Sequence, residues 1–187
     1  MTLAQLIRDE KTAVVDRWYD LVLSTYPGQT AKVWKANTDR FTNPVGQTTL
    51  RILGILVDQL LRWDDAKAVC APLEELVKIR AVQDFTPAKA LSFVFFFKKV
   101  LRELFAETIA REGLGGELAV FDGRVDNLAL MAFDIYVKSR EELYRMRVDE
   151  FKHAHRMLFR KAGLMCDSAE VLGGGAPPSQ DEPAGTE

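Results

Sequence analysis

Cysteine and histidine are scarce in this sequence. The 187 residues include two cysteines, Cys70 and Cys166, which lie far apart in the chain and outside any Cys-x-x-Cys motif. Two cysteines cannot form the disulfide framework of a small secreted protein. Residues 8–11 are all charged, whereas a secretory signal requires a hydrophobic region there. We therefore expect a cytoplasmic protein.

Long hydrophobic runs are absent as well. The longest, Phe93–Phe97, stops at two lysines, whereas a helix that spans a bilayer needs about 20 apolar residues. The apolar fraction of 48% is nevertheless too high for a mostly disordered chain. This composition predicts a folded protein whose contact with a membrane is at most peripheral.

The motifs of the common enzyme classes are missing too. The sequence has no glycine-rich phosphate-binding loop after a strand, no Gly-x-Ser-x-Gly motif and no set of residues that suggests a catalytic triad. Adjacent carboxylates such as Glu141 and Glu142 diverge on a helix. We therefore predict a non-enzymatic protein that needs no cofactor.

A metal or redox site is the main alternative. The only histidines, His153 and His155, are two residues apart and would lie on different faces of a helix. Glu150 and His153 form one Glu-x-x-His unit, but di-iron bundles need two such units and two further glutamates. A second copy of the chain would have to supply the rest. A redox role for Cys166 is the other form of this alternative.

Basic residues are missing from the C-terminal end. Residues 167–187 contain five acidic residues and no lysine or arginine, and residues 173–178 are all Gly, Ala or Pro. The formal net charge of −2 is thus the sum of −5 in this tail and +3 in residues 1–166. The composition predicts one folded domain over residues 1–166, followed by a disordered tail.

Helix signals occupy the rest of the chain. Thr2 and Gln5 form a capping box, while Asn43-Pro44 and Thr86-Pro87 each place an N-cap residue before a proline at the first helical position. Residues 90–97 are apolar on nearly every side, which predicts a buried central helix. Helices are expected from residue 3 to the stop signal at 26–28, then over 30–37, 44–63, 72–79, 87–112 and 117–163. The sequence therefore predicts an all-α bundle.

The last predicted helix is too long for one small domain. At 1.5 Å per residue, a helix of more than about 30 residues exceeds a domain diameter of about 30 Å. We expect its distal half to pair with a second copy of the chain. The predicted dimer and output surface is an apolar stripe at three- or four-residue spacing that includes Val125, Leu128, Ala132, Ile135, Leu143, Met146 and Leu158.

A polar group made of Arg80, Gln83 and Asp84 lies between apolar helices. Arg80 and Asp84 are one helical turn apart and could form a local salt bridge. Alternatively, the three side chains could line a ligand or partner pocket together with Phe93 and Phe97 of the apolar helix. Both interpretations stay open at this point.

Basic residues gather in the distal part of the last helix. Residues 138–161 contain eight lysines or arginines and four acidic residues. Few aromatic side chains accompany them and the acidic residues are interspersed, which favours a protein partner over nucleic acid. A peripheral accessory subunit that docks this helix on a membrane complex remains a further alternative.

Three segments of the sequence form a distinctive combination. They are residues 18–27, the segment Asp39–Gly46 with Arg-Phe-Thr-Asn-Pro, and the segment Ile79–Pro87 with Arg-Ala-Val-Gln-Asp-Phe. In this combination the chain resembles the RsbRD N-terminal domain family, the sensory module of RsbT co-antagonists. The resemblance covers most of residues 1–150.

This resemblance implies a bacterial, cytoplasmic stress-response sensor with a globin-like, haem-free fold. Related domains dimerise, and their long, protruding last helix leads to a STAS domain. In that family, the STAS domain is largely responsible for binding an RsbT-like kinase. Here the acidic tail stands where a STAS domain would begin. We therefore expect a stand-alone signal-transduction module that forms a homodimer and acts on an unknown regulatory protein.

Overall fold

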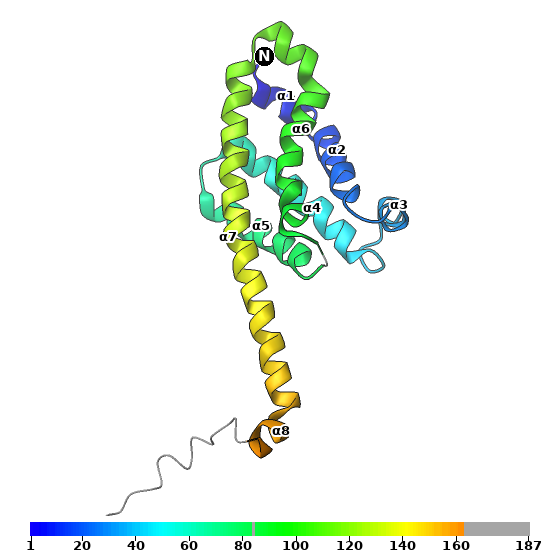
Figure 1. Ribbon diagram of the computed structural model, residues 1–187. Helices are drawn as coiled ribbons and strands as arrows, with labels where there is room; N and C mark the ends of the chain where they lie inside the picture. The colour runs from blue at the N-terminus through cyan, green and yellow to red at the C-terminus, as the bar shows by residue number, and fades with distance from the viewer. Residues whose placement is uncertain (84, 163–187) are drawn as a thin grey trace, which may run out of the picture. The chain divides into compact units, whose positions relative to one another are not determined.

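The computed structural model describes residues 1–83 and 85–162, and within them every regular element is an α-helix. The all-α prediction is confirmed. The helices are α1 (Leu3–Asp9), α2 (Lys11–Leu23), α3 (Gly28–Ala36), α4 (Pro44–Arg62), α5 (Ala66–Ala81), α6 (Pro87–Glu112), α7 (Gly115–Ala154) and α8 (Arg156–Lys161) (Figure 1). Asp84, Cys166 and the predicted tail over 167–187 lie outside the described residues.

The chain divides into two compact units, and the boundary falls inside α7. The first unit is Met1–Leu143 and the second begins at Tyr144. The composition of the sequence predicts a boundary only at the acidic tail. The length of the last helix is confirmed, because α7 contains 40 residues.

The predicted helix starts are confirmed by their capping contacts. The Thr2 side chain accepts from the Gln5 backbone N–H, and the Gln5 side chain accepts from the Thr2 N–H. The Asn43 Oδ1 atom accepts from the Gly46 N–H at the start of α4, and Thr86 accepts from Lys89 at the start of α6. These side chains satisfy backbone donors that have no partner within the first turn of a helix.

Three predicted helix boundaries are wrong. Pro72 lies inside α5, which begins at Ala66, because burial of Leu73, Leu76 and Val77 stabilises the helix despite the missing proline N–H. The N-terminal helix is interrupted at Glu10, so that α1 and α2 are separate. The last helix ends at Ala154 and is followed by the short α8 rather than continuing to residue 163.

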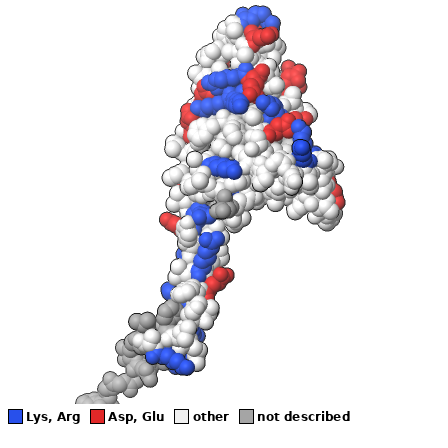
Figure 2. Space-filling model, turned by 45° about the vertical axis from the view of Figure 1, so that its right-hand side comes forward, with Lys and Arg blue, Asp and Glu red and all other residues white. Residues whose placement is uncertain are grey.

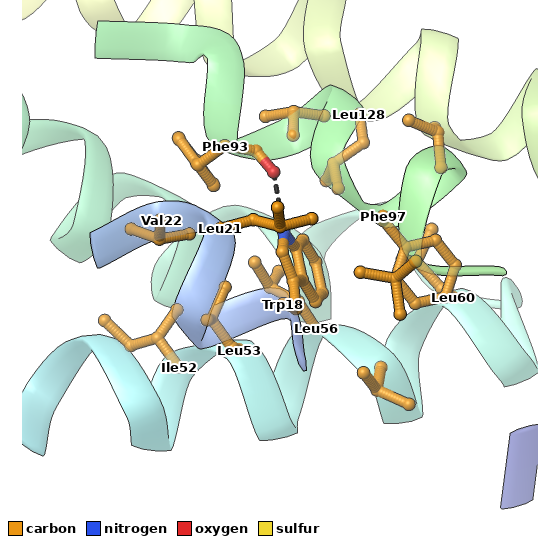
Figure 3. Close-up of a cluster of buried hydrophobic side chains, with 14 of the residues drawn as sticks. Trp18, Leu21, Val22, Ile52, Leu53, Leu56, Leu60, Phe93, Phe97 and Leu128 are labelled. Carbon is orange, nitrogen blue, oxygen red and sulfur yellow. Dashed lines mark hydrogen bonds between the residues drawn. The ribbon is translucent and has the colours of Figure 1, made fainter. Parts of the chain in front are cut away.

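The core of the first unit surrounds Trp18, which comes from α2. Side chains of α4 and α6 close around the indole, and Leu128 of α7 lies nearby (Figure 3). The indole Nε1–H donates to the Phe93 carbonyl oxygen at 2.7 Å, and its ring centroid lies 4.9 Å from that of Phe97. Because a buried indole needs an acceptor, this bond fixes how α2 packs on α6.

One face of α7 completes this core, and the expected dimer surface is corrected accordingly. Val125, Leu128 and Ala132 are fully buried within the first unit, so they are not available to a second copy. The spacing of apolar residues was right, but the neighbouring helices occupy this face. Ile135 and Leu143 are half-buried, whereas Met146 and Leu158 in the second unit are exposed.

No helix in the described part of the chain is long and apolar enough to cross a membrane.

Candidate functional site

Arg80 occupies the junction of three helices. Arg80 is 1% exposed and lies at the end of α5, against the end of α2 and the start of α6. The Nε and Nη2 groups donate to the backbone oxygens of Ala90 and Lys89 at 2.6 and 2.8 Å. Further bonds of 3.2 Å reach the hydroxyl oxygens of Thr25 and Tyr26. One guanidinium therefore joins α5, the start of α6 and the turn that follows α2.

Aromatic rings enclose the same guanidinium. Its central carbon lies 4.9 Å from the Phe85 ring centroid, 5.4 Å from that of Tyr26 and 5.7 Å from that of Phe93. The Tyr26 hydroxyl in turn donates to Gln83 Oε1 at 2.8 Å. Burial lowers the pKa of Arg80, and its interaction with Tyr26 opposes that shift. Ring faces and oxygen acceptors thus replace the water that a buried cation loses.

The predicted pocket is filled by the protein itself. The structure brings together Arg80, Gln83 and Phe93, whereas Phe97 packs beside Trp18 in the core. Phe93 and Phe97 are both fully buried, so neither offers a surface to a ligand from solvent. Arg80 with its neighbours is therefore a closed polar junction, and the open-pocket interpretation is corrected. The Arg80–Asp84 salt bridge falls on a residue outside the described part of the chain.

A second set of contacts joins α7 to the ends of other helices. Glu117 accepts from the Leu3 N–H at the start of α1 at 2.7 Å. Arg124 donates to the carbonyl oxygens of Leu60 and Leu61 at the end of α4. Arg140 donates to the Ala81 carbonyl oxygen, at the end of α5, at 3.1 Å.

Each of these charges has the sign that its helix end prefers. A helix N-terminus favours a carboxylate and a C-terminus favours a cation, because backbone dipoles leave partial charges there. No motif in the sequence predicts this role for Glu117, Arg124 or Arg140. Their position in the sequence gives little indication of a contact with a helix end, because a charged residue beside an apolar stripe ordinarily faces solvent.

The exposed face of α7 in the first unit carries large apolar side chains. Leu130 is 67% exposed, Phe133 52% and Val137 37%. At 100° per residue these positions lie about 110° to 170° around the helix from the buried face that contains Val125 and Leu128. The apolar residues of α7 therefore form two faces in the first unit. One is the buried part of the predicted stripe, and the other is this second face, which is exposed to solvent.

Several hollows lie away from Arg80. One of about 230 Å³ between α5 and α7 is lined by residues that include Cys70, Ile135 and Ser139, with Glu74 and Lys78 paired at its edge at 2.7 Å. Cys70 is half-buried. A second hollow of about 230 Å³, at the end of α4, is lined by Trp63, Asp64, Asp65, Val69 and Met131.

The predicted metal ligands lie in the second unit. Glu150 and His153 are exposed on α7. Within the described ranges, no group of three or more His, Cys, Asp or Glu side chains is placed to hold a metal ion. The His155 ring stacks on Phe151, with centroids 4.3 Å apart.

One protein-family model matches the chain. It is described as the RsbT co-antagonist protein rsbRD N-terminal domain, and the match covers residues 12–150. No curated protein and no solved structure matches. The match spans well over half of the chain and includes Asn43 at the start of α4 and the buried Arg80 junction. The chain therefore belongs to the RsbT co-antagonist protein rsbRD N-terminal domain family.

Proposed function

We propose that this chain is a non-enzymatic, cytoplasmic sensory module of the stressosome type, which relays a signal to a regulatory protein through α7. Membership of the family supports the sensory role. The observation that carries the relay is the set of charged α7 side chains at the ends of α1, α4 and α5.

The relay follows from how these contacts are distributed. A small shift of α4 or α5 would change the bonds that Arg124 and Arg140 make with the carbonyl oxygens at those helix ends. Arg80 couples α5 to α6 and to the turn that follows α2 through a second set of bonds. A signal that favours one packing arrangement of these helices would therefore change how α7 is held.

The output surface that we propose is the exposed face of α7. Leu130, Phe133 and Val137 would pack against the same residues of a second copy, because burying apolar area removes it from water. In the sequence, Tyr144 and Phe151 continue the seven-residue spacing of Leu130 and Val137. A seven-residue apolar repeat is typical of paired helices.

Light scattering of the purified chain tests this surface. We expect a mass near twice the 21.1 kDa of one chain at micromolar concentration. The variant F133E should be monomeric, because a carboxylate cannot be buried unpaired between two apolar faces. The matched control is V120E, since Val120 is exposed on α7 but lies on a different side of the helix. A wild-type monomer, or a dimer that survives F133E, would contradict the proposal.

A further inference from the structure

The loop between α3 and α4 presents a phenylalanine to solvent. Phe41 is 95% exposed, and Arg40 beside it is exposed as well. Both belong to the Arg-Phe-Thr-Asn-Pro segment, whose Asn43 and Pro44 start α4. Asn43 therefore has a structural role within the chain, whereas Arg40 and Phe41 contribute nothing to the core described above.

Hydrogen bonds hold this loop in one shape. The Asp39 Oδ1 atom accepts from the Phe41 N–H at 2.9 Å, and Asn37 Oδ1 accepts from the Asp39 N–H at 3.0 Å. Thr42 is bonded to the side chains of both Asn37 and Asp39. Asn43 Nδ2 donates to the Asn37 carbonyl oxygen at 2.8 Å. A side chain presented by an ordered loop loses less conformational entropy on binding than one on a flexible loop.

The hollow at the other end of α4 has the complementary chemistry. Trp63, Val69 and Met131 supply apolar walls, and the exposed Asp64 supplies negative charge at its edge. Its volume of about 230 Å³ is ample for a phenyl ring, since an apolar cavity of about 150 Å³ binds benzene. Trp63 ends α4 with a φ of 50°, a left-handed conformation that costs a non-glycine residue energy and places this residue beside the hollow.

We propose that the Arg40–Phe41 tip of one copy docks into the Trp63 hollow of a second copy, with the Phe41 ring against Trp63 and the Arg40 guanidinium against Asp64. The two parts cannot meet within one chain. They lie at opposite ends of α4, whose 19 residues separate them by about 28 Å (Figure 1). The contact joins unlike surfaces, so one copy of a pair keeps a free hollow and the other keeps a free tip. Such head-to-tail contacts build rings or open chains rather than closed pairs.

Charge reversal tests this contact with the full-length chain. The experiments use the F133E background, so that association through α7 does not contribute, and sedimentation is measured up to millimolar concentration. F41A, R40E and D64R should each weaken self-association by about tenfold or more, because the apolar anchor and the charge pair are both central. The double variant R40E/D64R should restore association to near the starting level.

Two control variants match these changes. F95A removes another exposed phenylalanine, and K32E reverses another exposed charge on α3, next to the loop. Neither should alter association by more than about twofold if the contact is specific. Circular dichroism and thermal midpoints of all variants should stay the same, since every changed side chain is exposed.

Disulfide trapping gives a second readout. In a C70S/C166S background, a mixture of R40C and D64C chains should form a disulfide between chains under mild oxidation, because docking brings the two positions together. R40C alone should form far less. Absence of concentration-dependent association in F133E, no effect of F41A, or failure of R40E/D64R to restore association would each overturn the proposal. None of these results depends on whether α7 forms the dimer described above.

Discussion

At the scale of single residues, buried polar side chains decide how the first unit is held together. Asn43, Thr49, Arg80 and Ser139 are all buried, and each has partners among the described residues. Tyr19 differs, because its buried hydroxyl makes no hydrogen bond there. Burial raises the pKa of Tyr19. Since an unpaired buried hydroxyl is costly, the partners of the other four matter for stability.

The first prediction concerns Arg80. We expect R80A to lower the free energy of unfolding by about 3 kcal/mol, because bonds to Thr25, Lys89 and Ala90 are lost and a cavity remains. R80K should cost about 2 kcal/mol, since a single ammonium cannot reproduce the guanidinium fork. Urea denaturation measures both changes. A loss below about 0.5 kcal/mol in R80A would show that this junction adds little stability.

At the scale of elements, α7 is held at helix ends as well as by its apolar face. Ion pairs add to these contacts, because Lys98 and Arg102 of α6 pair with Asp126 and Asp122 of α7. Exposed pairs of this kind each contribute little. The contact of Arg124 with the end of α4 is different, because it satisfies carbonyl oxygens that have no partner within the helix. It also places a positive charge at the negative end of the helix dipole.

The second prediction concerns Arg124. We expect R124A to lower the free energy of unfolding by about 1.5 kcal/mol, because a charged hydrogen bond to the end of α4 is lost. The matched control is R111A, which removes an exposed arginine that pairs with its neighbour Glu112 and should change stability by less than about 0.5 kcal/mol. Hydrogen exchange in the first turns of α7 should also quicken in R124A but not in R111A. Equal stability of the two variants would argue against the helix-end role.

At the scale of the whole molecule, the surface charges of the first unit are arranged largely in pairs. In Figure 2, many basic and acidic side chains lie next to one another rather than in separate areas. Several pairs join different helices, such as Arg17 of α2 with Glu103 of α6 at 2.8 Å, and Arg51 of α4 with Glu75 of α5 at 2.7 Å. A surface of this kind favours recognition of particular protein surfaces over general attraction to a polyanion.

The third prediction follows from the Glu103 pair. The hydrogen bond from Arg17 holds the pKa of Glu103 below its ordinary value, and desolvation opposes that shift. The pair therefore stabilises the fold above the ordinary glutamate pKa of about 4.3, and this contribution is lost as the pH falls through the lower folded value. Thermal midpoints measured between pH 6 and 3 should fall less steeply for E103Q than for the wild-type chain. E107Q, which changes an exposed glutamate on the same helix, should follow the wild-type curve.

Local sequence patterns were enough to predict the all-α class, the starts of α1, α4 and α6, and the family. These features depend on local chemistry: a side-chain oxygen caps the next turn of the helix, and proline fits the first helical position. Pro72 shows the limit of such local rules, because tertiary burial extended α5 through it.

Which face of α7 meets the core depends on how the helices pack against one another. Val125 and Leu128 repeat at helical spacing, and so do Leu130, Phe133 and Val137 on another side. Periodicity gives the spacing of an apolar face, but the side chains of neighbouring helices determine which face they cover. The same reason applies to Arg80, Trp63 and Phe41. Their burial or exposure depends on residues far away in the sequence, which no local pattern contains.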